Sequence, residues 1–182
     1  MEYLLITPEE YNDAPRLRDF HEKINANDFY QDRSYRIPMR TIIRIHPNEF
    51  MNFTDYLFQS VPLFSPRAMQ VIWRFSRDFL YKEMILFDPE EAKDKLYYLP
   101  FFPRFPAAVM NSPAFSDDSC DLDDDQEVRL TVPYEAPMFY VVTPYLCLVF
   151  MRLDVVESLL RHSCRGFAIR KVTVEEEAVN AG

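Results

Sequence analysis

Glycine is nearly absent from this chain of 182 residues, in which it occurs only as Gly166 and Gly182. The phosphate-binding loops of P-loop proteins, dinucleotide-binding folds and protein kinases need glycines where the backbone meets phosphate. The Gly-x-Ser-x-Gly turn of α/β-hydrolases needs two glycines close together. The sequence therefore excludes the function classes that these motifs define, and it predicts no cofactor.

Histidine is scarce as well, with only His21, His46 and His162 present. Neither His-x-Glu nor His-x-x-x-His occurs, and these are the short spacings that would indicate a metal site. We therefore assign the three histidines structural or solvent-facing roles and predict no metal site.

Cysteine is limited to Cys120, Cys147 and Cys164. The odd number and wide spacing are typical of reduced thiols rather than of a disulfide framework. Cys147 lies in an apolar run, which predicts a core position. Cys164 is close to His162 and Arg165, whose charges could lower a thiol pKa, so it is the candidate nucleophile if the chain is an enzyme. The favoured interpretation is an inert loop thiol near a helix end.

Long hydrophobic runs are missing too. The longest apolar stretch, residues 138–151, is interrupted by Thr143 and Pro144, whereas a membrane-spanning helix needs about eighteen or more apolar residues. Residues 1–11 lack the basic segment and the following apolar segment of a signal peptide. We therefore expect a cytoplasmic protein that does not bind membranes.

Apolar residues are nevertheless plentiful, at 48% of the chain, and include 16 Phe and 11 Tyr. This content predicts a folded core rather than disorder. We expect one domain over residues 1–174 and a frayed acidic tail over residues 175–182. Apolar or alternating patterns predict strands at residues 3–6, 35–45, 61–64, 83–87, 128–132, 138–150 (broken at Pro144) and 167–174.

Two main helices are predicted, at about residues 65–80 and 153–162. Ser65 is a good N-cap and Pro66 suits the first helical position, where a missing N–H costs nothing. Gly166 is expected to be the left-handed cap that ends the second helix. Together with the strands, these helices predict an α+β fold with a mixed or mostly antiparallel sheet.

The segment at residues 97–109 contains three prolines, Pro100, Pro103 and Pro106, which argue against both a helix and a central strand. We expect an extended crossing or an edge strand. Two interpretations of its aromatic residues stay open, a cover for the core or the lining of a groove or partner interface. These residues are Tyr97, Tyr98, Phe101, Phe102 and Phe105.

Negative charge is abundant but local. The net charge is −9, and residues 117–127 alone carry −7 through six Asp and one Glu. The acidic balance argues against nucleic acid as a ligand, because phosphate binding needs clustered Lys and Arg. The stretch imitates the start of a calcium loop, but such a loop needs glycine where Gln126 stands and glutamate where Val132 stands.

Two interpretations remain for the acidic loop at residues 116–127, which is predicted to be inserted in the domain. It is either a solvated loop or a charged surface that contacts a partner protein. The candidate partner-binding residues are Asp121, Asp123, Asp124 and Asp125.

Several segments together resemble a divergent group of bacterial immunity proteins from polymorphic toxin systems. The resemblance covers about residues 61–174 and rests on residues 63–67 before a helix, 97–99, the strand 138–142, the closing run 150–160 and the pair 166–167. It implies a small cytoplasmic protein, encoded beside a toxin gene, that binds and neutralises the cognate toxin. The group has no catalytic signature, so the resemblance assigns no functional residue.

The leading hypothesis is therefore an immunity-type protein that occludes a toxin, and not an enzyme. Two alternatives stay open. One is a structural or assembly subunit of a phage or secretion apparatus, for which aromatic, proline-rich segments are suitable. The other is a small enzyme of an unrecognised class, built on Cys164 with His162 or on a pair of carboxylates.

Overall fold

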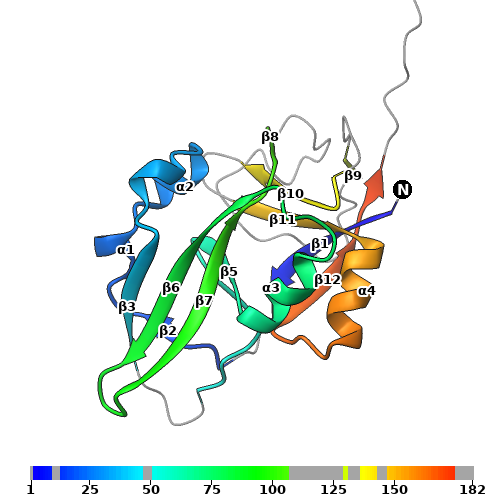
Figure 1. Ribbon diagram of the computed structural model, residues 1–182. Helices are drawn as coiled ribbons and strands as arrows, with labels where there is room; N and C mark the ends of the chain where they lie inside the picture. The colour runs from blue at the N-terminus through cyan, green and yellow to red at the C-terminus, as the bar shows by residue number, and fades with distance from the viewer. Residues whose placement is uncertain are drawn as a thin grey trace, which may run out of the picture.

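The computed structural model describes residues 2–9, 13–46, 51–106, 129–130, 136–142 and 147–174. Within these residues, two large β-sheets, a two-stranded β-pair and four short α-helices form the fold (Figure 1). The six-stranded sheet has the order β2 (Arg16–Leu17), β3 (Arg40–His46), β6 (Leu80–Asp88), β7 (Lys93–Phe101), β5 (Val61–Phe64), β4 (Tyr56–Gln59). The five-stranded sheet has the order β12 (Phe167–Lys171), β1 (Tyr3–Pro8), β11 (Cys147–Arg152), β10 (Met138–Val142), β8 (Arg104–Pro106). A two-stranded pair joins β9 (Arg129–Leu130) to β13 (Thr173–Val174).

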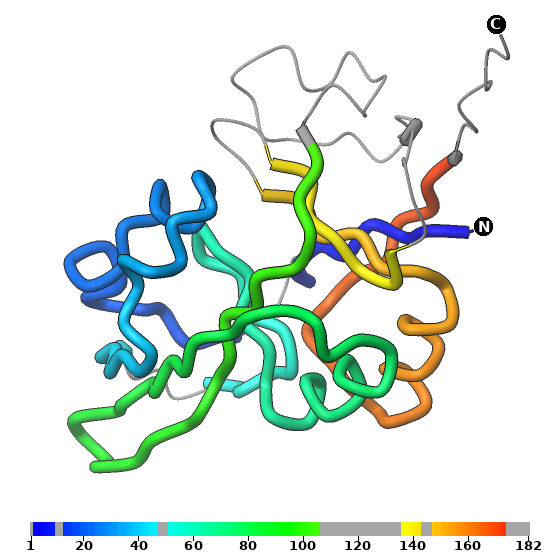
Figure 2. Tube along the Cα trace, turned by 45° about the horizontal axis from the view of Figure 1, so that its top comes forward, coloured from blue at the N-terminus to red at the C-terminus, as the bar shows by residue number. Residues whose placement is uncertain are grey.

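The strand pairing confirms the predicted α+β class. The β3–β6 and β8–β10 pairs are parallel within the two large sheets, and their other pairs are antiparallel. The helices are α1 (Phe20–Lys23), α2 (Ala26–Tyr30), α3 (Pro66–Ile72) and α4 (Leu153–Arg161), with a 3-10 turn η1 at Ser34–Arg36. Figure 2 shows α3 and α4 side by side, in agreement with their direct contacts.

One apolar cluster joins the two large sheets. It contains Leu4 and Tyr140 of the five-stranded sheet together with Ile43 and Leu99 of the six-stranded sheet. Successive residues of a strand point to opposite faces, so the neighbours of Leu4 and Tyr140 belong to a second cluster on the other face of the five-stranded sheet. Leu5, Phe139 and Phe150 are fully buried there. Both faces of this sheet are therefore apolar.

A largely buried arginine, Arg104, connects α2 to β8 and β10; its side chain is 13% exposed. The guanidinium carbon of Arg104 lies 4.6 Å from the centre of the Phe29 ring and 5.9 Å from that of Tyr140. Its Nη1 donates to the carbonyl of Phe29 at the end of α2, and the Asp32 carboxylate lies 3.7 Å from its Nε. Aromatic faces and a helix C-terminus both favour a cation, which explains why a charged side chain is accepted in this position.

The first predicted helix begins as expected but ends earlier. Ser65 Oγ accepts from the N–H of Ala68, and Pro66 is the first helical residue. The helix ends at Ile72 rather than near residue 80, because the ring of Trp73 packs at 5.5 Å from each of Tyr81 and Tyr98. This tertiary contact turns the chain toward β6. The second helix, α4, covers the predicted residues.

Proline did not exclude a central strand. β7 lies between β6 and β5, although Pro100 is one of its residues. The Pro100 carbonyl accepts a hydrogen bond from the Tyr140 hydroxyl at 2.9 Å. The N–H and C=O of one extended residue point to the same side, so the missing N–H of Pro100 faces Tyr140 rather than the β6 ladder. The prediction of an edge strand was therefore wrong for β7, but it holds for β8, which contains Pro106 and lies at the edge of the five-stranded sheet.

Four of the five aromatic residues of this segment agree with the interpretation as part of the core. Tyr97, Phe101, Phe102 and Phe105 are buried, and Tyr98 is half-buried. The strand predicted at residues 3–6 is β1, which lies between β12 and β11. The strand predicted over residues 138–150 is present as β10 and β11.

Gly166 is not the helix cap. The residue with left-handed backbone after α4 is Ser163, with φ 55°. Gly166 follows three residues later with φ 93°, and a Cβ added to it would lie 2.3 Å from Thr54 Cβ. Glycine is required here because the Thr54 side chain and the Tyr56 carbonyl oxygen, 2.9 Å from the added Cβ, leave no room for a side chain.

We expect Gly166→Ala to lower the free energy of unfolding by about 2–4 kcal/mol, because it combines a left-handed backbone with a steric clash. Urea unfolding followed by circular dichroism measures the change. Ser163→Gly is the matched control: it removes a Cβ from a left-handed residue and should leave stability unchanged or raise it by up to about 1 kcal/mol. Equal effects of the two variants would contradict the assignment of close packing to Gly166.

Candidate protein-interaction surface

The residues predicted to bind a partner lie outside the part of the chain that the structure describes. These are Asp121, Asp123, Asp124 and Asp125, together with the rest of the acidic loop at 116–127 and the tail at 175–182. Their role stays a prediction.

A different surface is present on the six-stranded sheet, and we call it the open sheet face. It consists of side chains on one side of β3, β6 and β7, which lie next to one another in Figure 1. The cross-strand register places Ile42 beside Ile85, and Ile85 beside Leu96. Ile42 is 53% exposed, and the other two are half-buried. An apolar row therefore crosses three strands at the surface.

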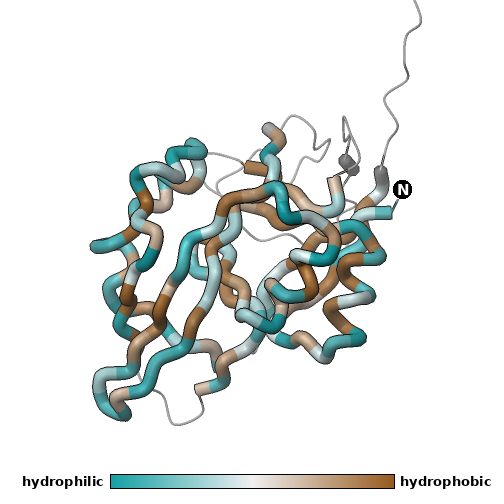
Figure 3. The backbone as a smooth tube through the Cα atoms, viewed as in Figure 1, coloured by the Kyte–Doolittle hydropathy of each residue, from teal (hydrophilic) through white to brown (hydrophobic). Residues whose placement is uncertain are grey.

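Charged residues flank the apolar row on both sides. On one side, Arg40 is paired with Glu83, with 2.6 Å between Arg40 Nε and Glu83 Oε2. On the other side, Arg44 lies beside Phe87, which is beside Asp94. Figure 3 shows how the hydrophilic tip of the β6–β7 hairpin continues from this end. An apolar centre with a polar rim is the usual anatomy of a protein–protein interface.

Three aromatic side chains extend the open sheet face toward α3. Trp73, Tyr81 and Tyr98 lie with ring centres 5.4–5.5 Å apart, and Tyr81 is 37% exposed. Burial, and then the Glu83 carboxylate, raise the pKa of the Tyr98 hydroxyl, so it is a neutral phenol that can donate and accept hydrogen bonds. Rigid aromatic side chains with polar ends are enriched in the energetic centres of interfaces.

Asp19 fixes the Arg44 end of the open sheet face. The Asp19 side chain is 1% exposed, and its Oδ2 lies 2.7 Å from Lys23 Nζ and 2.9 Å from Arg44 Nε. Its Oδ1 accepts from the Arg44 backbone N–H at 2.8 Å. Burial raises the pKa of the carboxyl, but the hydrogen bonds from Lys23 and Arg44 outweigh burial and lower the pKa to about 2.

Sequence reasoning did not predict the open sheet face, although a signal for it existed. Residues 84–87 are four consecutive apolar residues in a predicted strand, and Ile42 and Ile43 are a similar pair. A strand that is apolar at successive positions has apolar side chains on both faces. The outer face of such a strand must be covered by something or be exposed, and here it is exposed.

The candidate nucleophile Cys164 lacks the predicted activation. The thiol is buried, and burial, together with the nearby Asp55 carboxylate, raises its pKa to about 11 instead of lowering it. His162 is engaged elsewhere: its Nδ1 lies 2.7 Å from the Ser158 carbonyl and its Nε2 lies 3.0 Å from Arg74 Nη1. The raised pKa is the opposite of activation and agrees with the favoured interpretation of an inert thiol. Cys147, as expected, is a core residue.

Within the described ranges, no group of three or more His, Cys, Asp and Glu side chains is arranged to hold a metal ion. No helix in those ranges has both the length and the apolar character needed to cross a membrane. Comparison of the chain with models of protein families and with curated proteins finds no match.

We expect Asp19→Asn to lower the free energy of unfolding by about 2 kcal/mol at pH 7, since one pKa unit corresponds to about 1.4 kcal/mol. The folded-state pKa is depressed, so this stabilisation is present above about pH 4 and is lost as the pH falls toward 2. Urea unfolding at pH 7 and at pH 2.5 measures it. The difference in the free energy of unfolding between wild type and Asp19→Asn should become smaller at the lower pH. Asp94→Asn, at an exposed position, should unfold with the same free energy as wild type. A difference for Asp19→Asn that does not change with pH would contradict the pairing of Asp19 with Lys23 and Arg44.

Proposed function

We propose that this chain is a binding protein of the immunity type, which neutralises a cognate bacterial toxin by covering it. The observation that carries the proposal is the open sheet face, in which a row of exposed apolar side chains is flanked by charges and by the Trp73–Tyr81–Tyr98 cluster. The resemblance of residues 61–174 to immunity proteins supports the choice of a toxin as the partner.

Occlusion is the proposed mechanism, and it needs no catalytic step. The apolar row would exclude water from the contact, and the three aromatic rings would supply contact area at a low cost in side-chain entropy. Asp19 and Glu83 hold Arg44 and Arg40 in place at the two sides of the row. Pre-arranged side chains lose less freedom on binding, which favours affinity.

The acidic loop has a separate role in this proposal. Asp121, Asp123, Asp124 and Asp125 would attract a toxin whose substrate groove is basic and would accelerate the encounter. The chain would act in the cytoplasm, where such a toxin reaches its substrate. The acidic residues would thus speed association, while the open sheet face would keep the complex from dissociating.

Substitutions on the open sheet face test the proposal. Ile42→Glu places a buried charge in the centre of the contact, and Tyr81→Ala removes an aromatic ring. Each should weaken toxin binding by about 2 kcal/mol, or roughly thirtyfold, and prevent rescue of cells that express the toxin. Isothermal titration with the toxin encoded by the adjacent gene measures the affinity, and circular dichroism confirms folding of each variant.

Leu160→Ala is the matched control, because Leu160 is an exposed apolar residue on α4 rather than on the sheet. It should bind the toxin as wild type does. Full rescue by both sheet variants would overturn the proposed contact surface. A self-associating protein that forms no complex with the toxin would instead favour the alternative of an assembly subunit.

Replacing the four candidate aspartates by asparagine tests the acidic loop separately. The association rate should fall about tenfold at low salt and much less at high salt, because salt screens long-range attraction. The dissociation rate should change little. Stopped-flow mixing at two salt concentrations measures both rates. A slower association that does not depend on salt would argue against electrostatic steering.

A further inference from the structure

The exposed face of β3 carries two arginines with one isoleucine between them. Residues of β3 alternate strictly between exposed and buried, so Arg40, Ile42 and Arg44 all belong to the open sheet face. A strand rises by about 3.3 Å per residue, which places the Cα atoms of Arg40 and Arg44 about 13 Å apart. The two arginines therefore lie on opposite sides of the apolar row, which begins at Ile42.

A carboxylate of the chain itself holds each arginine by the same atom. Glu83 Oε2 lies 2.6 Å from Arg40 Nε, and Asp19 Oδ2 lies 2.9 Å from Arg44 Nε. A guanidinium group has five N–H donors, and each of these bonds uses one of them. Within the part of the chain that the structure describes, Nη1 and Nη2 of both side chains make no hydrogen bond. Because the side chains are 65% and 49% exposed, these groups can be reached by a partner.

The segment around α1 holds the edge of β3 that faces away from β6. The Ile42 carbonyl accepts from Lys23 Nζ at 2.5 Å. At Arg44, the N–H donates to Asp19 Oδ1 at 2.8 Å, and the carbonyl accepts from the Arg18 N–H at 2.7 Å. The backbone between the two arginines is therefore fixed before any partner binds.

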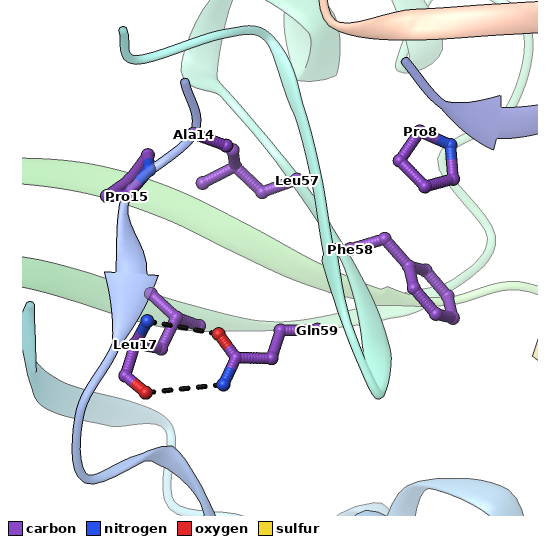
Figure 4. A pocket seen from close by; sticks show the side chains of 7 residues that line it. All are labelled: Pro8, Ala14, Pro15, Leu17, Leu57, Phe58 and Gln59. Atoms are coloured by element: carbon purple, nitrogen blue, oxygen red, sulfur yellow. Dashed lines mark hydrogen bonds between the residues drawn. The ribbon is translucent and has the colours of Figure 1, made fainter. Parts of the chain in front are cut away.

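β2 anchors the Arg44 end of the strand further. Leu17 of β2 pairs with Ile45, the residue that follows Arg44. Gln59 of β4 in turn holds Leu17: its Oε1 accepts from the Leu17 N–H at 3.0 Å, and its Nε2 donates to the Leu17 carbonyl at 3.2 Å (Figure 4). Two side chains on a strand held in this way keep a nearly constant separation, which favours a partner with a matching spacing.

The charge at the two sides of the row favours a carboxylate over a phosphate. Glu83 balances Arg40, and Asp19 offsets part of the positive charge of Arg44 and Lys23. Nucleic-acid phosphates are bound by clustered Lys and Arg whose charge is not compensated. A carboxylate needs only two parallel N–H groups of one guanidinium. The Nη1 and Nη2 groups of each arginine supply such a pair.

We propose that the open sheet face recognises two carboxylates of the toxin, which lie about 13 Å apart on either side of an apolar side chain. Arg40 binds one carboxylate and Arg44 binds the other, each through Nη1 and Nη2, and the apolar side chain packs on Ile42. The carboxylates belong to a part of the toxin other than the basic groove that attracts the acidic loop. This inference rests on the proposed function and adds the chemistry of the partner at that site.

Specificity follows from the fixed separation of the two arginines. A toxin with one carboxylate, or with two at another spacing, engages only one of them. The other arginine is then desolvated without a partner, which penalises the wrong toxin.

Lysine substitutions test the recognition of carboxylates by isothermal titration with the toxin encoded by the adjacent gene. Arg40→Lys and Arg44→Lys keep the positive charge that pairs with Glu83 or Asp19. The single ammonium group lacks the planar pair of N–H groups that binds a second carboxylate. Each variant should therefore bind the toxin about tenfold more weakly than wild type.

Arg161→Lys is the matched control. Arg161 is also exposed and also lies near a carboxylate, with 3.4 Å between its Nη2 and Glu157 Oε2, but it belongs to α4. This variant should bind the toxin as wild type does. Circular dichroism checks the folding of all three variants, and if Arg44→Lys does not fold, Arg40→Lys decides alone.

Double-mutant cycles identify the toxin carboxylates. Each exposed Asp and Glu of the toxin is replaced in turn by Asn or Gln, and its binding to wild type and to each lysine variant is measured. One replacement should weaken binding to wild type but not to Arg40→Lys, because the shared contact is already lost. A different replacement should behave in this way with Arg44→Lys, and none should do so with Arg161→Lys.

Two outcomes overturn this inference and leave the proposed function intact. One is binding of the toxin by both lysine variants as tightly as by wild type. The other is a set of cycles in which no toxin carboxylate couples to either arginine, or in which the same one couples to both. A wild-type chain that does not bind the toxin instead overturns the proposed function, and this inference with it.

Discussion

The fold depends on a contact between two chain segments that are far apart in sequence, residues 54–56 and residues 164–166. The Asp55 N–H donates to the Arg165 carbonyl at 2.9 Å, and Asp55 Oδ2 accepts from the Arg165 N–H at 2.9 Å. Asp55 Oδ1 and its carbonyl accept from the hydroxyl and the N–H of Ser65. One residue thus joins the start of β4, the N-cap of α3 and the connection from α4 to β12. These bonds connect the two large sheets, and the approach is so close that only glycine fits at position 166.

Because glycine is scarce, other residues must adopt the left-handed backbone conformation that glycine usually takes. Positive φ occurs at Asp32, Ser60, Ala92 and Ser163. An L-residue adopts this conformation at a cost of about 1–2 kcal/mol. The surrounding contacts must compensate for this. Ser60, for example, lies in the tight turn between β4 and β5, and its carbonyl accepts from the Tyr30 hydroxyl. The Tyr30 hydroxyl therefore supplies a long-range hydrogen bond that holds this strained turn in place.

Local signals in the sequence predicted those parts of the fold that local forces decide. Ser65 and Pro66 mark the start of α3, and α4 occupies the predicted residues, because capping and helical periodicity act within a few residues. The end of α3 and the central position of β7 were not predictable in this way. They depend on Trp73 reaching Tyr81 and Tyr98, and on Tyr140 reaching the carbonyl of Pro100, which are contacts across the fold. The open sheet face could have been found from residues 84–87, but its exposure depends on which faces α3 covers.

In the proposed complex, the rate of encounter and the lifetime of the complex depend on different parts of the chain, because its charge is unevenly distributed. Residues 117–127 contain seven of the 29 acidic residues and none of the 20 Lys and Arg residues. Long-range attraction scales with uncompensated charge and acts on the rate of encounter, while a desolvated apolar contact acts on the lifetime of the complex. A surface such as the open sheet face, where Arg40 and Arg44 are already paired with Glu83 and Asp19, contributes little long-range field. In the proposed complex, its contribution would come from shape and apolar area, and we propose that the specificity for the partner depends on this surface.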